Sequence, residues 1–145
     1  MNKRSLLAAA VALGLAFCAS YASAAELVPV NFDGPDEGYN DPTPATPVGG
    51  NPGTTIGEQR QIVAQFAADL WSAVLVSNQP IYVGAQFNPL APNVLGSAGA
   101  SFIFRDFPHA GVANTWYPSA EADAISGTDL NPGYTDIGSQ FSSTY

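Results

Sequence analysis

Few side chains in this sequence of 145 residues offer the chemistry that catalysis or metal binding requires. Its single histidine, His109, stands in the loop-like segment FPHAGVANTWY. A zinc hydrolase needs several histidine or carboxylate ligands at helical spacing, as in His-Glu-x-x-His, and the sequence contains no such motif. A lone histidine among proline and glycine residues is more often an exposed polar group than a ligand or a catalytic base. We therefore assign neither role to His109.

The other usual signatures of an active site are missing as well. Serine is plentiful, but the Gly-x-Ser-x-Gly turn that presents a nucleophilic serine does not occur. The only cysteine, Cys18, lies in an N-terminal segment that we expect to be removed. The glycines of VGGNPGTTIGEQ lack the lysine and the preceding strand of a phosphate-binding loop. The sequence therefore predicts no catalytic residue, no cofactor-binding residue and no metal ligand.

Two groups of residues leave a binding role open. Four acidic residues gather in the segment NFDGPDEGYND, namely Asp33, Asp36, Glu37 and Asp41. Carboxylates can hold calcium, but this spacing differs from that of an EF-hand loop, and a solvated turn is the favoured interpretation. Trp116 and Tyr117 could form a sugar-binding platform, although aromatic residues that anchor a loop or a core are commoner.

Residues 1–25 have the three parts of a secretory signal peptide. The basic start NKR precedes the uncharged run SLLAAAVALGLAFCAS, and ASA at 22–24 supplies the small residues that signal peptidase needs. The apolar run is too short for a comfortable membrane span. Phe17 precedes Cys18 where a lipoprotein signal has a small residue, which favours soluble export over lipidation. We expect a secreted or periplasmic protein, cleaved near Ala24 and Ala25.

Removal of this signal sharpens the acidity of the chain. Two basic residues, Arg60 and Arg105, then face twelve acidic residues, which gives a net charge of −10 with His109 neutral. Such a chain repels phosphate backbones and anionic lipids, which argues against nucleic-acid partners and against membrane binding after signal cleavage. No cysteine remains to form a disulfide, so the core must hold the fold unaided. The remaining length, about 120 residues, suits one domain.

Residues 26–54 have the composition of an extended arm, because proline, glycine, asparagine and aspartate are frequent in them. Within the arm only ELVPVNF predicts a short strand, and its Pro29 favours a sheet edge. A helix over about 56–76 follows and opens with a capping box of Thr55 and Glu58. Its apolar residues form one stripe that we expect to lie on a sheet: Ile62, Val63, Phe66, Ala67, Leu70, Trp71, Val74 and Leu75.

Strands are predicted at about 81–87, 100–107 and 135–142. The segment IYVGAQF alternates with a period of two, which is typical of a strand with one buried face. The segment SAEADAISG predicts a short helix with Ser119 as its cap and Gly127 after its end. The sequence therefore predicts an α+β fold in which one long amphipathic helix packs on a small mixed sheet.

Two stretches of the sequence resemble one family of secreted bacterial proteins. They are GYNDPTPATPVGGNPGTTIGEQRQIVAQFAADLWSAVLVSNQPIYVGAQFNPL and, further along, VLGSAGA with FP…NTWYPSAEADAISGTDLNPGYTDIGSQFSS. Together they span nearly all of residues 31–143. Members of that family look like zincin-type metallopeptidases, often with an inserted protease-associated (PA) domain. The segment TDIGSQFSS resembles the strand that precedes their zinc helix and also a strand of the metzincins.

The resemblance implies that residues 55–145 are part of a metallopeptidase-like α+β domain, an incomplete zincin-like half-domain. The family's zinc helix, of the His-Glu-x-Gly-His-Gly-Leu-Gly-Phe kind, has no counterpart here, so no ligand or catalytic residue is carried over. Zinc is expected for the full-length family, and no cofactor is expected for this chain. The implied partner is the remainder of the catalytic domain or, at full length, a protein or peptide substrate. The oligomeric state stays open.

Three functional hypotheses follow. The leading one is an exported N-terminal scaffold portion of a secreted zinc metallopeptidase, inactive alone, with peptide-bond hydrolysis in the full-length protein. The alternative is a secreted binding or adhesion module that uses its sheet and loop aromatics without catalysis. The third is a truncated fragment without independent function.

Overall fold

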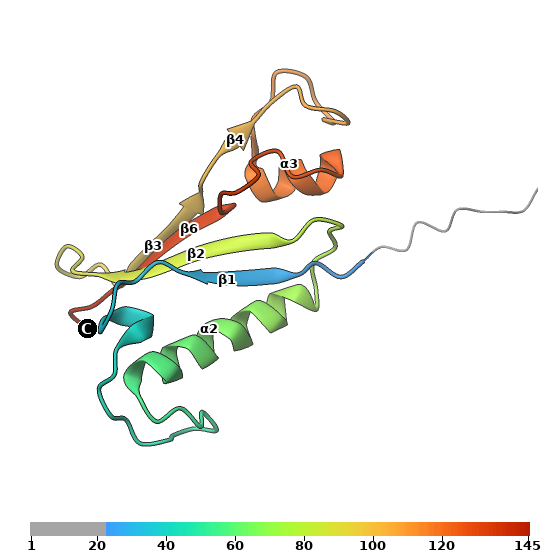
Figure 1. The fold of residues 1–145 in the computed structure, drawn as a ribbon. Helices are drawn as coiled ribbons and strands as arrows, with labels where there is room; N and C mark the ends of the chain where they lie inside the picture. The colour runs from blue at the N-terminus through green and yellow to red at the C-terminus, as the bar shows by residue number, and fades with distance from the viewer. Residues whose placement is uncertain (1–22) are drawn as a thin grey trace, which may run out of the picture.

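The computed structural model describes residues 23–145 (Figure 1). Residues 1–22, and with them nearly all of the predicted signal peptide, lie outside this described part. The elements are β1 (Leu27–Asn31), the 3-10 helix η1 (Gly38–Asn40), α2 (Ile56–Ser72), β2 (Ile81–Asn88), β3 (Gly96–Ala100), β4 (Ile103–Phe104), β5 (Tyr117–Pro118), α3 (Ser119–Ser126) and β6 (Ile137–Ser142). No helix within residues 23–145 is both long and apolar enough to cross a membrane.

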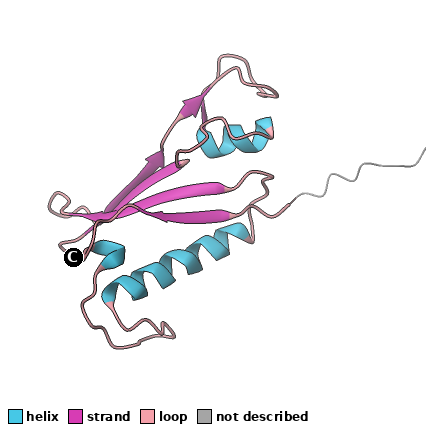
Figure 2. Cartoon of the chain, in the orientation of Figure 1, coloured by secondary structure: helices cyan, strands magenta, loops and turns pink. Residues whose placement is uncertain are grey.

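Four strands form a mixed sheet in the order β1-β2-β6-β3, while β4 and β5 form a separate two-stranded ladder. β1 and β2 run parallel, with Leu27 beside Ile81, and β2 and β6 run parallel, with Val83 beside Ile137. β3 is antiparallel to β6 and forms the other edge. α2 supplies the long connection that the parallel pair β1 and β2 requires (Figure 2). The predicted α+β class with a small mixed sheet is thereby confirmed.

The strand predicted over 100–107 is wrong. Residues 96–100 form β3 instead, and β4 covers only Ile103–Phe104. The chain leaves the four-stranded sheet between β3 and β4. The Ser101 N–H still donates to Asp136 O at 2.8 Å, next to β6, whereas β4 pairs with β5. β3 reads GSAGA, which lacks the apolar alternation that identifies a strand from sequence. The other two predicted strands coincide with β2 and β6 to within two residues.

The arm predicted over 26–54 contributes a strand to the sheet and then folds back over α2. β1 is an edge strand that includes Pro29, in agreement with the position that this proline favours. Further along, the Gly57 N–H at the start of α2 donates to Asp41 O at 2.9 Å. The arm therefore holds the N-terminal end of the helix in place.

α2 begins with the predicted capping box and ends earlier than predicted. The Glu58 N–H donates to Thr55 Oγ1 at 3.1 Å, and the Thr55 N–H donates to Glu58 Oε2 at 3.2 Å. The predicted helix continued to about residue 76, whereas α2 ends at Ser72. Ser72 Oγ accepts a hydrogen bond from the Leu27 N–H at 2.9 Å. This end of the helix therefore holds the start of β1.

Replacing Thr55 with alanine should lower the free energy of unfolding by about 1 kcal/mol, because the N–H groups at the start of α2 lose an acceptor. Thr55→Ser keeps the hydroxyl and should stay within about 0.5 kcal/mol of the parent protein. Urea unfolding followed by far-ultraviolet circular dichroism measures both values. Equal losses in the two variants would contradict a capping role for the hydroxyl.

The apolar stripe of α2 is largely exposed, so the expected packing of a long amphipathic helix on the sheet is not confirmed. Four of its large side chains within α2 are more than half exposed: Val63, Phe66, Leu70 and Trp71. α2 lies along one face of the sheet and packs mainly against η1 and the edge strand β1 (Figure 1). The buried apolar residues of the described chain are correspondingly few and mostly small: Ala25, Tyr39, Ala68, Ile81, Ala85 and Ala122.

α3 begins at the predicted residue, but that residue is not its cap. Ser119 is fully buried, its Oγ donates to Asp136 O at 2.8 Å, and Pro118 occupies the N-cap position. Gly127 follows the helix with φ 73°, a left-handed conformation that glycine adopts without strain, as predicted. α3 packs against β4 and β5, so Ser119 ties this group of elements to the start of β6.

Candidate functional site

An apolar groove with a volume of about 1080 Å³ lies between α2 and the sheet. One wall is formed by Val63, Ala67 and Trp71 of α2 and by Leu75, just beyond the end of the helix. The three helical residues recur at intervals of four, which places them on one face of α2. Because α2 packs mainly against β1 and η1, this face is not pressed onto the central strands. The groove therefore remains open along the helix.

The opposite wall is formed by alternate residues of the two central strands. They are Val83, Ala85 and Phe87 of β2, and Ile137, Ser139 and Phe141 of β6. In the parallel register each β2 residue stands beside its β6 counterpart, and the rings of Phe87 and Phe141 lie 5.4 Å apart. Period-two alternation within each strand puts these side chains on the same face of the sheet. The wall is therefore an apolar surface that is continuous across both strands.

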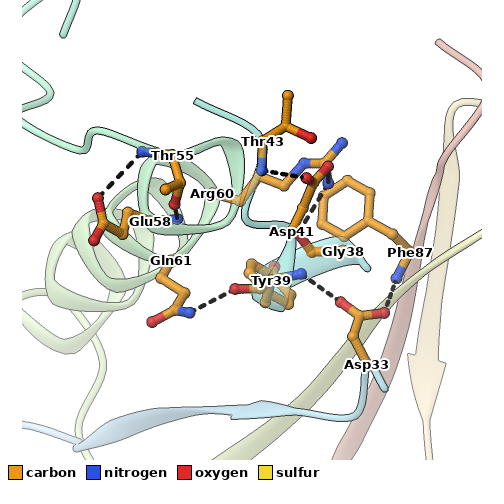
Figure 3. A network of polar contacts seen from close by, with 10 residues as sticks. All are labelled: Asp33, Gly38, Tyr39, Asp41, Thr43, Thr55, Glu58, Arg60, Gln61 and Phe87. Carbon is orange, nitrogen blue, oxygen red and sulfur yellow. Dashed lines mark hydrogen bonds and ion pairs between the residues drawn. The ribbon is translucent and has the colours of Figure 1, made fainter. Parts of the chain in front are cut away.

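Arg60 lies at one end of the groove, where α2 meets η1 (Figure 3). Its guanidinium carbon is 4.1 Å from the centroid of the Phe87 ring, and its Nη1 donates to Gly38 O at 2.9 Å. The same nitrogen lies 3.6 Å from Asp41 Oδ2. A cation over an aromatic face and beside a carboxylate is well compensated. Arg60 therefore joins α2, η1 and β2.

Three of the four acidic residues that left a calcium site open, Asp33, Glu37 and Asp41, accept hydrogen bonds from backbone N–H groups, and within residues 23–145 the four do not come together as a metal-holding group. Asp33 Oδ2 accepts from the Tyr39 N–H and Oδ1 from the Phe87 N–H, both at 2.7 Å (Figure 3). Hydrogen bonds from the side chain and the backbone of Thr43 hold the pKa of Asp41 below its usual value. These contacts agree with the favoured interpretation of this segment as a turn.

The other residues singled out in the sequence do not form a joint site. His109 is exposed in a turn and has φ 69°. Trp116 is 55% exposed, and the Arg105 guanidinium lies 4.9 Å from its ring centroid. Tyr117 is half-buried, and its Oη accepts from the Val112 N–H at 3.1 Å. Tyr117 therefore anchors the loop, while its neighbour Trp116 stays at the surface.

The residues present do not fit the zinc site that the resemblance implies for the full-length family. Within residues 23–145, no three histidine, cysteine, aspartate or glutamate side chains come together in a way that could hold a metal ion. His109 lies in an exposed turn, whereas zinc ligands of this class lie on one face of a helix. We therefore derive no hydrolytic step from this chain.

A buried pair of carboxyl groups lies where α3 meets β6, and sequence patterns did not reveal it. Asp123 and Asp136 are each 3% exposed, and they lie within hydrogen-bonding reach of one another. Asp136 Oδ2 accepts from the Tyr82 N–H and Asp123 Oδ1 from the Leu130 N–H, both at 2.9 Å. The pKa of Asp123 is raised to about 6, mainly by burial and also by the neighbouring carboxyl groups of Asp136 and Asp129, against the lowering effect of the Leu130 N–H.

Raising the pH through about 6, the pKa of Asp123, should lower the stability of the fold. The pKa of Asp123 in the folded state, about 6, exceeds the ordinary value of 3.8 for an aspartate, so the folded state binds a proton that the unfolded state releases. The stability that this bound proton contributes is fully present below the pKa of the unfolded state and is lost as the pH rises through the pKa of the folded state. The asparagine in Asp123→Asn cannot ionise, so the free energy of unfolding of this variant should decrease less as the pH rises. Urea unfolding between pH 4 and 7, with a chelator present to remove metal ions, measures the free energy of unfolding of both proteins. Parallel pH profiles for the two proteins would contradict the prediction.

Comparisons of the chain with protein-family models, with curated proteins and with solved structures find no match. The fold and the groove define a small α+β unit whose sheet exposes an apolar face beside α2. The buried carboxyl pair is a separate feature at the junction of α3 and β6.

Proposed function

We propose that the chain is the exported N-terminal scaffold portion of a zinc metallopeptidase domain, and that it is inactive by itself. The apolar groove carries this proposal, because a contiguous apolar surface of this kind usually marks a place where further protein packs. The likeness of the sequence to secreted metallopeptidases suggests the class. In the proposal, α2 and the sheet form the scaffold of the domain, and the rest of the catalytic domain provides the zinc ligands and the catalytic residues.

The proposed occupant of the groove is a second helix that packs beside α2. α2 has 17 residues and so a length of about 25 Å at 1.5 Å per residue. Helices that pack side by side lie about 8–10 Å apart, and each buries an apolar stripe. Val63 and Trp71 on one wall and Phe87 on the other would contact such a stripe. The remainder of the catalytic domain is the proposed source of this element.

Zinc content and peptide hydrolysis test this proposal directly. The chain should bind no stoichiometric zinc and should not cleave a library of quenched fluorescent peptides. A longer product that contains the chain and the rest of the domain should cleave peptides, and a chelator should abolish its activity. One tightly bound zinc ion per chain, or hydrolysis by the chain alone, would overturn the claim that it is a scaffold.

Two exposed residues of α2 provide a matched test of the groove. Val63 lines the groove and is 60% exposed, whereas Phe66 lies outside its lining and is 64% exposed. Val63→Glu and Phe66→Glu should therefore fold equally well in the chain alone. In the longer product Val63→Glu should sharply reduce the soluble yield, and Phe66→Glu should not. Equal yields of the two variants would remove the groove as the assembly surface.

A second candidate function is a secreted, non-catalytic module that binds extended peptides. β3 favours it, because all five of its residues are exposed and it forms an edge of the sheet. An exposed edge offers backbone N–H and C=O groups to an added strand. Selection from a random peptide library should then yield binders to the chain alone, and Ala98→Pro should weaken them. Failure to select any binder would leave only the scaffold proposal.

A further inference from the structure

The carboxyl pair of Asp123 and Asp136 requires compensation that the arginines do not provide. Both side chains are 3% exposed, and two neighbouring carboxylates cannot both be ionised in such a place without a compensating charge. The ion pairs of the described residues lie elsewhere, since Arg60 pairs with Asp41 and Arg105 with Asp106. The pair must therefore hold a proton or a cation.

Asn131 provides a second and independent observation at the same place. Its side chain is 6% exposed, and its Oδ1 is fully buried without a hydrogen-bond partner. Its Nδ2 lies 3.4 Å from Asp136 Oδ1, which is longer than the usual range of about 2.7–3.2 Å for such a bond. The amide nitrogen therefore faces Asp136, while the amide oxygen has no partner among the described residues. A bound cation would provide a partner for this buried acceptor, whose side chain contacts Asp136 of the carboxyl pair.

We propose that Asp123, Asp136 and Asn131 form a calcium-binding site. Carboxylate oxygens and the carbonyl oxygen of asparagine are the ligands that calcium prefers, at about 2.3–2.6 Å. Two such ligands at right angles around one ion stand about 3.4 Å apart. Asn131 Nδ2 and Asp136 Oδ1 already have this separation. Rotation of the amide by a half-turn exchanges its nitrogen for its oxygen, which places an oxygen ligand at the same position. Two carboxylates together neutralise one divalent cation.

The chemistry of the ligands favours calcium over other metals. Sulfur and imidazole ligands, which select zinc and copper, are absent from this set of three residues. Magnesium demands a near-ideal octahedron and retains several waters, which a buried site accommodates poorly. Calcium accepts irregular coordination by protein oxygens. The site is thus suited to a hard cation with flexible geometry.

Calcium here would connect segments that are distant in the chain. Asp123 belongs to α3, Asn131 to the following loop, and Asp136 precedes β6. Asp136 also accepts from the Tyr82 N–H of β2 at 2.9 Å. A bound ion would therefore fix α3 and its loop to the central strands of the sheet. We expect calcium to raise the stability of this junction, whatever the catalytic status of the chain.

Titration of the chelator-treated chain with CaCl₂ tests the site. Calorimetry should show one site with a dissociation constant of about 10⁻⁵ to 10⁻³ M, which extends from the weakest calcium sensors to extracellular modules. The melting temperature should rise with CaCl₂ and much less with MgCl₂ at equal ionic strength. Asp123→Asn should lower the affinity at least tenfold, whereas Asp36→Asn, which removes the same charge from the arm, should leave it unchanged.

A variant with the opposite expected effect separates loss of a ligand from loss of folding. Asn131→Asp adds a third carboxylate, so it should bind calcium more tightly than the parent and be less stable than the parent in chelator. A misfolded variant would not gain affinity. Equal responses to calcium and magnesium, equal losses in Asp123→Asn and Asp36→Asn, or no binding at all would overturn the site. The last result would leave the pair holding a proton only.

Discussion

Asp33→Asn should lower the free energy of unfolding by about 2–4 kcal/mol, because hydrogen bonds to a charged group contribute about 1.5–3 kcal/mol each. The carboxylate of Asp33 accepts two backbone hydrogen bonds of 2.7 Å, from Tyr39 in η1 and from Phe87 in β2. Asparagine has one acceptor oxygen, so one of these N–H groups would face an amide NH₂ group instead. The junction between the arm and the sheet would lose a bond at its centre.

Asp36→Asn is the matched control for this prediction. It removes the same charge from the same turn, but Asp36 is exposed. Its φ of 61° is a conformation that asparagine adopts readily. We expect a change within about 0.5 kcal/mol, as for most surface substitutions. Urea unfolding of both variants, followed by tryptophan fluorescence, gives the comparison. Similar losses would mean that net charge, and not the two hydrogen bonds, controls this turn.

The features that sequence predicted well depend on residues close together in the chain. The capping box joins Thr55 and Glu58, and the φ of 73° at Gly127 follows from its place just after a helix. The alternation in IYVGAQF likewise predicted β2 and the side of it that lines the groove. Such signals are local, so one sequence suffices to read them.

The features that sequence missed depend on distant contacts. Asp33 reaches Phe87, and Asp136 reaches Tyr82, each across 54 positions in the chain. The apolar pattern of α2 shows which residues share a face, but it does not show whether another element covers that face. β3 was not predicted because its glycine, serine and alanine residues show no alternation of apolar and polar side chains. It is a strand because it pairs with β6.

Gly57 is the position where the local rule and the tertiary contact make opposite predictions. Within a helix, alanine is more favourable than glycine by about 1 kcal/mol, so Gly57→Ala should stabilise α2 on local grounds. Gly57 is buried, however, and a Cβ there would lie 2.6 Å from Tyr39 O and 2.8 Å from Asp41 N. These are backbone atoms of the arm, which cannot move aside as a flexible side chain can.

We therefore expect Gly57→Ala to destabilise the protein by about 2 kcal/mol or more, since overpacking costs about 1–3 kcal/mol and here also displaces the arm from the helix. The hydrogen bond of 2.9 Å from the Gly57 N–H to Asp41 O should be lost with it. Gly99→Ala is the control, because no atom lies within 4 Å of its added Cβ. Thermal unfolding of the two variants gives the measurement. A Gly57→Ala protein as stable as the Gly99→Ala protein would show that the arm yields at this contact and that α2 does not depend on it.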